Sequence, residues 1–472
     1  MNKTKIICTI GPASDKKEVF TELVNNGLSI ARLNLSHGNQ AYYTQTIAMI
    51  REVEETLNKP IGILLDTRGP EIRTMTFVDG KVTLTAGAFA TLYYGEDVGT
   101  AESFCITYPD LYKDVTEGHL ILLDDGLIEL EVVEVINKKI KCVVKNGGIL
   151  KNRKGINVPR VNISLPTLTE DDKSDIIFGI KQGIDYIAAS FIRRKEDLES
   201  IRKLLDEHDG SDIKIISKIE NQEGIDNIES IIEVSDAVMV ARGDLGVEIP
   251  TELIPTKQKL IIAACNAAEV PVITATQMLV SMSSNTRPTR AEVSDVYNAV
   301  LDGTDAIMLS GETAAGLYPV ESVKVMRKTA DAAENTINYK RAFKRLSKMK
   351  HKSITNAVSY SACSTAMQLD ASAIICPTFG GSTARLVSLF RPSTPIIAPT
   401  ANKRVCRQMQ LLWGVMPLIL QMETSTDILF YKAIEAAKQI GVVKKDDLVV
   451  ITTGIPLGTP GSTNLMRVHS VD

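Results

Sequence analysis

The stretch ISKIENQEG, residues 216–224, ends an apolar run with a lysine and a glutamate on one face. Lys218 and Glu220 are two residues apart, so in a strand their side chains project to the same side. A buried strand that ends in a cation and a carboxylate needs partners for both charges. The rest of the chain indicates where those partners lie.

Seven other apolar runs also end in polar or glycine-rich residues, and helical-period stretches such as 14–27 and 194–208 follow most of them. In 14–27, Ser14 is the expected N-cap and Gly27 the expected stop. Continuous apolar strands alternating with helices predict a parallel sheet covered on both faces. Eight such units predict an α/β fold, a closed (β/α)8 barrel with its site at the C-terminal strand ends. With 213–221, the runs are 5–11, 29–38, 61–71, 185–191, 237–246, 271–278 and 306–313.

Two segments depart from this alternation. Residues 72–167 are rich in Val, Thr and Tyr between turns, which predicts an inserted all-β barrel domain that serves as a mobile lid. After the basic segment KRAFKRLSKMKHKS, interpreted as a solvated helix end and linker, a new pattern predicts a C-terminal α/β domain. The expected boundaries are 1–71 and 168–340 for the barrel, 72–167 for the insertion and 341–472 for the last domain.

Composition narrows the class of protein. The 472 residues carry a formal charge of −4, so no basic field favours nucleic acid or membrane partners. The seven cysteines form no C-x-x-C pair, which favours reduced thiols. No apolar run approaches the roughly 20 residues that span a bilayer, and the first apolar run is too short for a signal peptide. We expect a cytoplasmic protein.

The strand ends supply the candidate chemistry. Glu220 and Asp244 follow neighbouring strands, and two carboxylates suit Mg²⁺ or Mn²⁺. Lys218 would then offset negative charge that develops on a substrate. The alternative is a purely structural cluster of buried ion pairs. Gly243 and Asp244 would open a short helix able to hold an anion.

Further polar residues complete the ring. Thr276 is a candidate hydroxyl ligand or an ordinary strand threonine, and Ser310 is a second hydroxyl. Arg32, Asn34 and Ser36 share one face by their spacing of two, and LLDTRGPEIR brings Asp66, Thr67, Glu71 and Arg73. Arginine binds phosphate or carboxylate in a bidentate manner. The oxygens of Asn, Ser, Asp and a backbone carbonyl form a cage without excess charge, which suits a monovalent cation. The five histidines form no zinc pattern, and no Walker A sequence occurs.

Taken together, these motifs resemble the pyruvate kinase family. The resemblance rests on long strings that cover the barrel and the insertion, and more weakly the C-terminal domain: KIICTIGPAS, ARLNLSHG, LLDTRGPEIRT, DDGLIELEV, KGINVP, ASFIR, ISKIENQEG, MVARGDLGVEIP, TATQML, RPTRAEVSDV and DAIMLSGETAAGLYPVE. It implies transfer of a phosphoryl group from phosphoenolpyruvate to ADP, giving pyruvate and ATP in the last step of glycolysis. Such transfer depends on positioning and charge neutralisation, which agrees with the absence of a histidine dyad.

The resemblance also implies roles for individual residues. Arg32 and Lys218 would act on the moving phosphoryl group, and Thr276, with Ser310 and water, would be a route for the proton. Glu71 goes with dependence on K⁺ in families of this kind. The remaining sets would be Gly243, Asp244 and Thr276 for the substrate carboxylate; Glu220 and Asp244 for Mg²⁺; Asn34, Ser36, Asp66 and Thr67 for K⁺; and Arg73, Lys154, Asn34 and His37 for the nucleotide.

The C-terminal domain carries PTFGGSTAR and TTGIPLGTPGSTN, in which glycines and hydroxyls precede a helix or follow a strand. Free N–H groups and hydroxyls at a helix start can cradle a phosphate. This resembles the allosteric site of pyruvate kinases for a sugar phosphate or AMP, with Thr378, Ser382, Thr383 and Arg385 as candidates; ordinary turn chemistry is the alternative. The resemblance also implies a homotetramer. Two other functions stay open: a Mg²⁺-dependent aldolase or lyase acting on pyruvate or oxaloacetate, and a catalytically inactive sugar-phosphate sensor.

Overall fold

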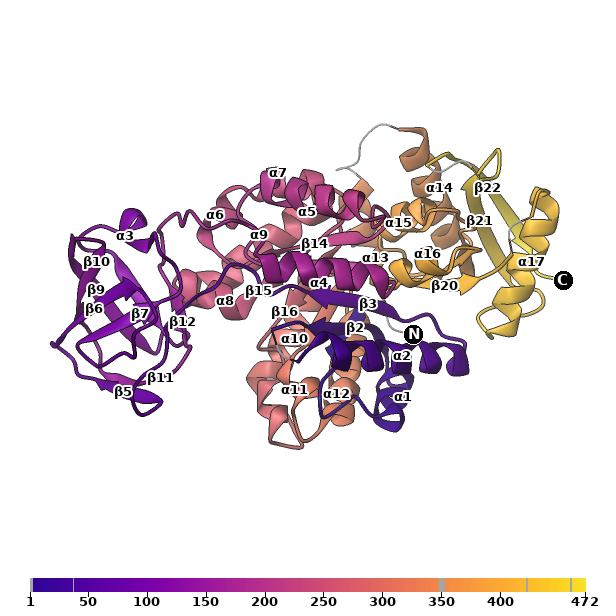
Figure 1. The fold of residues 1–472 in the computed structure, drawn as a ribbon. Coiled ribbons are helices and arrows are strands. Elements are labelled where there is room, and N and C mark those ends of the chain that lie inside the picture. Colours follow the sequence, from indigo (N-terminus) through magenta and orange to yellow (C-terminus); the bar gives the residue numbers. More distant parts are fainter. Residues whose placement is uncertain (1–2, 37, 348–352, 422, 459–460) are drawn as a thin grey trace.

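The computed structural model describes residues 3–36, 38–347, 353–421, 423–458 and 461–472. Three parts follow one another along the long dimension of the molecule (Figure 1). The inserted β domain lies at one end, the barrel in the middle and the C-terminal domain at the other end. His37, one of the predicted nucleotide ligands, lies outside the described residues.

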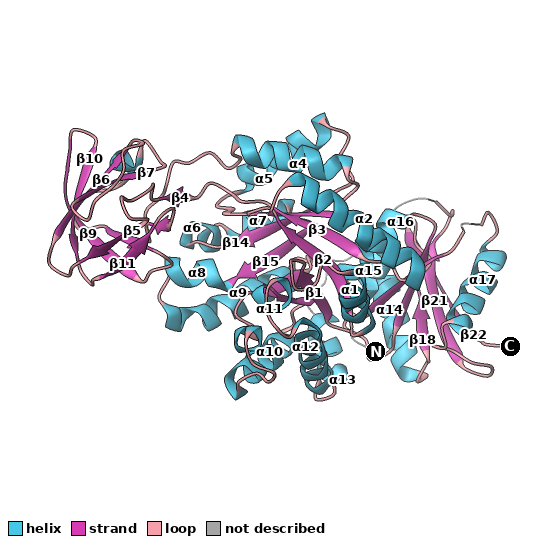
Figure 2. Cartoon of the chain, turned by 60° about the horizontal axis from the view of Figure 1, so that its bottom comes forward, coloured by secondary structure: helices cyan, strands magenta, loops and turns pink. Residues whose placement is uncertain are grey.

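Eight parallel strands form a closed barrel, and every one of the eight predicted runs supplies one strand (Figure 2). Each strand pairs with its neighbours in parallel register, for example Lys218 beside Met239 and Asn34 beside Asp66. The predicted α/β barrel is therefore confirmed. In ring order, the strands are β1 (Lys5–Thr9), β17 (Ala306–Leu309), β16 (Val272–Ala275), β15 (Ala237–Ala241), β14 (Lys214–Ile219), β13 (Tyr186–Ala189), β3 (Gly62–Asp66) and β2 (Leu28–Asn34).

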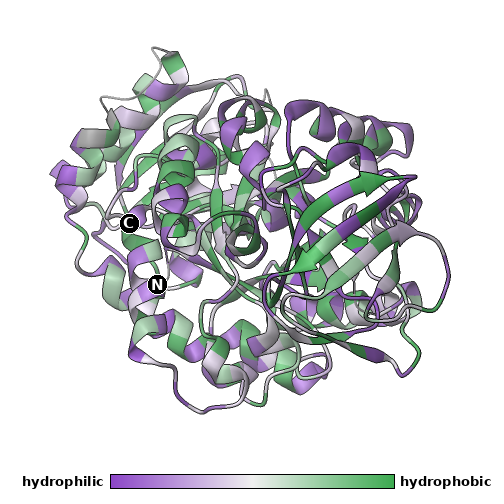
Figure 3. Cartoon of the chain, turned by 90° about the vertical axis from the view of Figure 1, so that its left-hand side faces the viewer, coloured by the Kyte–Doolittle hydropathy of each residue, from purple (hydrophilic) through white to green (hydrophobic). Residues whose placement is uncertain are grey.

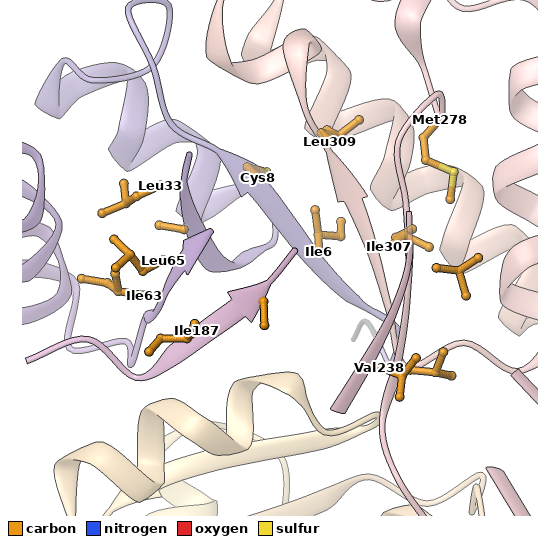
Figure 4. Packing of buried hydrophobic residues seen from close by; sticks show 14 of the residues in the cluster. Ile6, Cys8, Leu33, Ile63, Leu65, Ile187, Val238, Met278, Ile307 and Leu309 are labelled. Carbon is orange, nitrogen blue, oxygen red and sulfur yellow. The ribbon is translucent and has the colours of Figure 1, made fainter. Parts of the chain in front are cut away.

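Alternate residues of these strands belong to two separate hydrophobic clusters. Ile7, Ile30 and Ile216 belong to a small cluster of barrel-strand residues that Leu411 of the C-terminal domain joins. Residues of the opposite strand face, such as Ile6 and Leu33, belong to the larger cluster that the strands share with the surrounding helices (Figure 4). Because side chains alternate along a strand, the residue two positions after an inward one also points inward.

Helices surround the barrel, as the alternating pattern predicts. Helix α5 (Lys195–Glu207) confirms the prediction for 194–208. Helix α1 (Lys17–Asn25) stops just before Gly27, whose φ of 121° takes the chain out of the helix. The predicted N-cap Ser14 is wrong, because its buried hydroxyl accepts a hydrogen bond from the Gly11 amide instead. Other barrel helices are α2 (Gln40–Leu57), α4 (Glu170–Lys181), α6 (Gln222–Asp226), α7 (Ile228–Val234), α8 (Arg242–Glu248), α9 (Ile254–Ala267), α10 (Arg290–Asp302), α11 (Gly311–Ala314) and α12 (Pro319–Glu334).

The insertion between β3 and β13 is a β domain with its own core. In Figure 3, hydrophobic and hydrophilic segments follow one another along its strands. The alternation is regular in β9, where Ile128 and Leu130 are buried and Glu129 between them is not. Its main sheet has the order β4 (Ile72–Arg73), β12 (Gly155–Asn157), β8 (Leu120–Leu123), β9 (Ile128–Ile136), β10 (Lys139–Val144), β6 (Phe89–Tyr94) and β7 (Ser103–Ile106), beside the pair β11 (Gly148–Lys151) and β5 (Lys81–Leu84) and a short helix α3 (Leu111–Asp114).

The two connections to the inserted domain meet at a single buried carboxylate, that of Asp172 in α4. One oxygen accepts hydrogen bonds from the amides of Arg68 and Gly69 in the first connection, each at 3.1 Å. The other oxygen accepts from the amide and hydroxyl of Thr169, at the end of the second connection, at 3.1 and 2.7 Å. Both connections of the inserted domain are thus held together at this carboxylate of the barrel.

The C-terminal domain is a five-stranded sheet with helices, as the pattern predicts. The segment from Lys340 is not simply a solvated linker, because Phe343 of α13 (Tyr339–Ser347) packs in the core of this domain. Residues 348–352 of the same segment lie outside the described part. The sheet order is β20 (Val415–Ile419), β19 (Ile396–Thr400), β18 (Ala373–Ile375), β21 (Leu448–Gly454) and antiparallel β22 (Thr463–Ser470); the helices are α14 (Ile354–Gln368), α15 (Ser382–Ser388), α16 (Lys403–Gln408) and α17 (Thr426–Gln439).

A buried ion pair joins this domain to the barrel. Arg391 contacts Asp305 at 2.8 Å, and its guanidinium lies 4.8 Å from the ring centre of Trp413. Asp305 also accepts a hydrogen bond from the Val272 amide at the start of β16. Burial raises the pKa of Asp305 and Arg391 opposes that shift. In the described part of the chain no helix is both long and apolar enough to cross a bilayer, and all seven cysteines are buried free thiols.

We expect Arg391→Met to lower the apparent free energy of unfolding at pH 7 by about 3–5 kcal/mol, because Asp305 loses its buried counter-charge. Without Arg391, the folded-state pKa of Asp305 rises further above the unfolded value of about 3.9. The folded state then binds the extra proton, so the variant's stability falls as pH rises from about 4 to 7. Urea unfolding at both ends of this range measures the effect.

Arg467→Met is the matched control, since the ion pair of Arg467 with Asp427 is exposed and worth roughly 0–1 kcal/mol. Equal losses in the two variants, or no pH dependence for Arg391→Met, would contradict the assigned role of the interdomain pair.

Candidate active site

The polar residues of the site form the next layer of inward-pointing side chains after the apolar layer of the barrel. Ile7, Ile30, Leu64, Ala188 and Ile216 are inward residues of five strands. Two positions further along each strand, the alternation places a polar residue inside the barrel mouth. These residues are Thr9, Arg32, Asp66, Ser190 and Lys218, and all five are buried.

Lys218 is the centre of this layer. Its ammonium contacts Asp66 Oδ1 at 3.1 Å, Glu220 Oε1 at 2.9 Å and Ser190 Oγ at 2.8 Å. An ammonium has three donors, so each of them has one partner here. Burial alone would lower the pKa of Lys218, but Asp66 and Glu220 raise it above its ordinary value. Lys218 therefore stays charged, and its side chain lies on the same side as that of Glu220, as their spacing of two residues predicts.

Arg32 shares the Asp66 carboxylate with Lys218. Its Nε donates to Asp66 Oδ2 at 2.6 Å, and its Nη1 donates to the Thr9 hydroxyl at 2.8 Å. Burial would raise the pKa of Asp66, but Lys218 and Arg32 outweigh that effect and lower it. Two cations thus stand on either side of one ionised carboxylate. Nη2 of Arg32 makes no hydrogen bond with the described residues.

The carboxylates of Glu220 and Asp244 lie in different environments. Glu220 is 1% exposed, and its Oε2 accepts the Phe191 amide at 2.6 Å, whereas Asp244 is exposed. Burial raises the pKa of Glu220; Lys218 opposes this shift and Asp244 adds to it. Among the described residues, no group of three or more His, Cys, Asp or Glu is placed to hold a metal. A cation held by these two carboxylates would need further oxygens from a substrate or water.

Helix α8 begins immediately after β15, as expected for an anion-binding turn. The Gly243 amide donates to the Thr276 hydroxyl at 2.7 Å. Thr276 follows β16 with a φ of 64°, and buried Arg242 donates to its carbonyl at 2.6 Å. Ser310, after β17, has a buried hydroxyl that makes no hydrogen bond with the described residues. Gly243 and its chain neighbour Asp244 therefore lie beside Thr276, as expected for residues that follow adjacent barrel strands.

A cavity of about 480 Å³ separates the barrel mouth from the inserted domain. Glu71, Arg73 and Lys154 line one side, and Asp244 and Glu248 line the other. Arg73 donates to Glu71 Oε2 at 2.6 Å, and Lys154 pairs with Asp124 at 2.7 Å. The two predicted nucleotide cations, Arg73 and Lys154, thus face the same cavity as Asp244.

The predicted monovalent-cation residues lie at the ends of β2 and β3. Asn34 Oδ1 accepts the Ser36 amide at 3.2 Å, and Asn34 pairs in register with Asp66. The Thr67 carbonyl accepts the Ser190 hydroxyl at 2.7 Å. Both oxygens of Asp66 are engaged by Arg32 and Lys218.

The predicted effector residues divide into two groups. Thr378, Ser382 and Thr383 line a small pocket with the loop after β21, and the Gly381 amide donates to the Thr378 hydroxyl at 3.0 Å. Arg385 is not in this lining; its Nη1 donates to the Glu269 carbonyl of the barrel at 2.9 Å.

Three residues in contact with the predicted site had not been identified from the sequence: Thr9, Ser190 and Phe191. Thr9 and Ser190 carry the same signal as Lys218, since each follows an inward apolar residue by two positions. Phe191 has a φ of 54°, which is unusual for a bulky residue and which no sequence pattern announces.

Comparisons with known proteins agree along the whole chain. The family model described as "Pyruvate kinase, barrel domain" matches residues 1–323, and that of "Pyruvate kinase, alpha/beta domain" matches residues 356–469. The chain is 52% identical over 473 residues to a pyruvate kinase of Bacillus licheniformis, covering 100% of this chain and 81% of that one. It is 50% identical over 473 residues to a pyruvate kinase of Clostridium acetobutylicum, covering 100% of both.

A solved structure gives the same result in three dimensions. The crystal structure of a pyruvate kinase from Cryptosporidium parvum aligns with a TM-score of 0.96 at 39% identity, covering 100% of this chain and 96% of that one. Sequence identity of about half over the full length and the same fold leave one assignment: the chain is a phosphotransferase that belongs to the pyruvate kinase family.

Proposed function

We propose that the protein transfers the phosphoryl group of phosphoenolpyruvate to ADP with help from a divalent cation and K⁺. The observation that carries this proposal is the position of Lys218 and Arg32, two buried cations in contact with the carboxylates of Asp66 and Glu220 at the ends of the barrel strands. Phosphoryl transfer needs charge neutralisation and positioning more than a covalent nucleophile. A structural ion-pair cluster alone would not explain the exposed Asp244 next to buried Glu220.

In this proposal, Arg32 contacts the phosphoryl group through the part of its guanidinium that Asp66 and Thr9 leave available. Lys218 stabilises the negative charge while the bond from phosphorus to the enol oxygen breaks and the bond to an ADP oxygen forms. The Gly243 amide and Thr276 orient the substrate carboxylate at the start of α8. The enolate carbon then takes a proton by a route that includes Thr276, with Ser310 and water.

The donor set fits a hard divalent cation. Glu220 and Asp244 would hold Mg²⁺ or Mn²⁺ through carboxylate oxygens, and the bound ion supplies charge neutralisation to the substrate oxygens. Burial raises the pKa of Glu220 and Asp244 adds to that shift, so a cation held between the two carboxylates would favour their ionised forms.

For K⁺, we propose Asn34, Ser36, Asp66 and the Thr67 carbonyl, whose oxygens lie at adjoining strand ends. Arg73 and Lys154 would bind the nucleotide phosphates across the cavity, with Asn34 and His37 near them. Closure of the inserted domain over this cavity would exclude water from the reacting groups. We keep the expected domain boundaries 1–71, 72–167, 168–340 and 341–472 as part of this proposal.

We further propose that Thr378, Ser382 and Thr383 bind a phosphate of an allosteric activator, a sugar phosphate or AMP. Hydroxyls at the start of α15, a helix whose N-cap residue makes no side-chain hydrogen bond, support it. The contact of Arg385 with the barrel would link this domain to the catalytic one. A homotetramer in the cytoplasm is the expected state by family likeness.

The first test measures pyruvate formation from phosphoenolpyruvate and ADP, coupled to lactate dehydrogenase. We expect turnover that needs Mg²⁺ or Mn²⁺ and stops when the metal is chelated. Lys218→Met should reduce this turnover at least 100-fold, because the transferred phosphoryl group loses its counter-charge. No turnover in the wild type, even with sugar phosphates or AMP present, combined with release of carbon dioxide from oxaloacetate, would favour the lyase alternative.

The second test concerns Glu71. Replacing Glu71 with Lys should let the enzyme work with little K⁺, because a fixed side-chain cation takes over part of the ion's charge. Rates with and without K⁺ are compared for wild type, Glu71→Lys and the control Glu71→Gln, which removes the carboxylate but adds no cation. If Glu71→Lys needs as much K⁺ as the wild type, the link between Glu71 and the cation is wrong.

The third test concerns the effector pocket. Ser382→Ala should abolish or weaken at least tenfold any activation by fructose bisphosphate, glucose 6-phosphate, ribose 5-phosphate or AMP, while the basal rate stays unchanged. Ser361→Ala, on an exposed face of α14, serves as the control in the same domain. Full activation of Ser382→Ala by the compound that activates the wild type would place the effector elsewhere.

A further inference from the structure

Ser190 follows β13, is 4% exposed, and contacts both Lys218 and Thr67. Its hydroxyl accepts a hydrogen bond from the Lys218 ammonium at 2.8 Å. The same hydroxyl donates to the Thr67 carbonyl at 2.7 Å. Its amide donates to the Thr67 hydroxyl at 3.2 Å, so two bonds join Ser190 to Thr67.

We propose that Ser190 is a positioning residue that fixes the direction of the Lys218 ammonium. It also connects this ammonium to Thr67, whose carbonyl is one of the oxygens proposed above to bind K⁺. The proposal deepens the function proposed above and rests on it for the roles of Lys218 and Thr67. The physical coupling between Ser190 and Lys218, however, can be measured without any activity.

The geometry of Lys218 supports the first half of the proposal. Its other two partners, Asp66 and Glu220, are carboxylates that attract the ammonium from two sides. The third donor needs an uncharged acceptor, because a third carboxylate would leave excess negative charge in a buried site. The Ser190 hydroxyl is that acceptor, and without it the long lysine side chain regains rotational freedom.

The geometry of Thr67 supports the second half. A serine hydroxyl has one hydrogen, and the shorter of its two possible donations is to the Thr67 carbonyl, at 2.7 Å against 3.4 Å to Asp66 Oδ1. The hydroxyl therefore receives from the ammonium and donates to the carbonyl, a head-to-tail arrangement in which each bond strengthens the other. The carbonyl proposed to bind K⁺ is thereby oriented by a group that also contacts Lys218.

Ser190→Ala removes this hydroxyl, and Ser217→Ala is the matched control. Ser217 is also a buried serine of the barrel, within β14 and next to Lys218 in sequence, but its hydroxyl pairs with Ser235. We expect Ser190→Ala to lower kcat roughly 10- to 100-fold, the value for a lost hydrogen bond to a charged group, with a smaller change in the KM for phosphoenolpyruvate. The half-saturating K⁺ concentration should rise severalfold. Ser217→Ala should change neither.

A double-mutant cycle tests the contact independently of turnover. Thermal midpoints are measured for Ser190→Ala, Lys218→Met and the double variant, and for the same cycle built on Ser217→Ala. We expect the losses to be non-additive for Ser190 and additive for Ser217. If Ser190→Ala does not fold, Ser190→Cys, of similar volume and weaker hydrogen bonding, replaces it in both experiments.

Wild-type kcat and K⁺ response in Ser190→Ala, or an additive cycle with Lys218→Met, would overturn the proposal. A wild-type enzyme with no phosphoenolpyruvate-dependent turnover would instead overturn the proposed function, and the thermal cycle would still decide whether Ser190 positions Lys218. A loss of kcat with an unchanged K⁺ response would show that Ser190 does not act on Thr67, and would therefore refute the proposed connection.

Discussion

Two cations and two carboxylates lie buried together at the rim of the barrel, and each is tolerated there because of the others. Asp66 stands between Lys218 and Arg32, and Glu220, two residues after Lys218 and just past the end of β14, contacts the same ammonium. An isolated buried charge would be neutralised or expelled, so the set is stable only as a compensated group. The barrel meets this constraint because its strands deliver the four side chains from three different directions into one layer.

The same constraint explains why the site depends on register. Parallel pairing places Asp66 beside Asn34 and Ser217 beside Val238. A shift of one residue in any of the strands that carry Arg32, Asp66 and Lys218 would turn the charged side chain towards the surrounding helices and an apolar neighbour into the barrel mouth. The apolar layer of Ile7, Ile30 and Ile216 therefore does more than fill the barrel, since it fixes the register that assembles the charges above it.

Much of this was predictable from the sequence, because buried parallel strands are continuous apolar runs and eight of them are easily counted. The shared side of Lys218 and Glu220 followed from their spacing, and a short helix was expected at Gly243 and Asp244, close to where α8 begins. The roles of Thr9 and Ser190 were missed, although the two-residue alternation that identified Lys218 applies to them equally. A hydroxyl at a strand end is common, and its partners become visible only when the neighbouring strands are placed.

Other features could not be predicted because distant parts of the chain determine them. Ser14 has the type and position of an N-cap, yet its hydroxyl turns back to Gly11, and α1 starts at Lys17 without it. The segment from Lys340 reads as a polar linker, but Phe343 finds a core that is built from residues after 360. The left-handed backbone of Phe191 presents its amide to Glu220, a contact that spans 29 positions of the chain.

The carboxylate of Asp172 has a mechanical consequence. Here both connections of the inserted domain converge on one carboxylate, which receives two amides from the first and an amide and a hydroxyl from the second. The two connections of the insertion are therefore held at a fixed spacing at the N-terminus of α4, so neither connection can shift without breaking a hydrogen bond to the carboxylate that also holds the other.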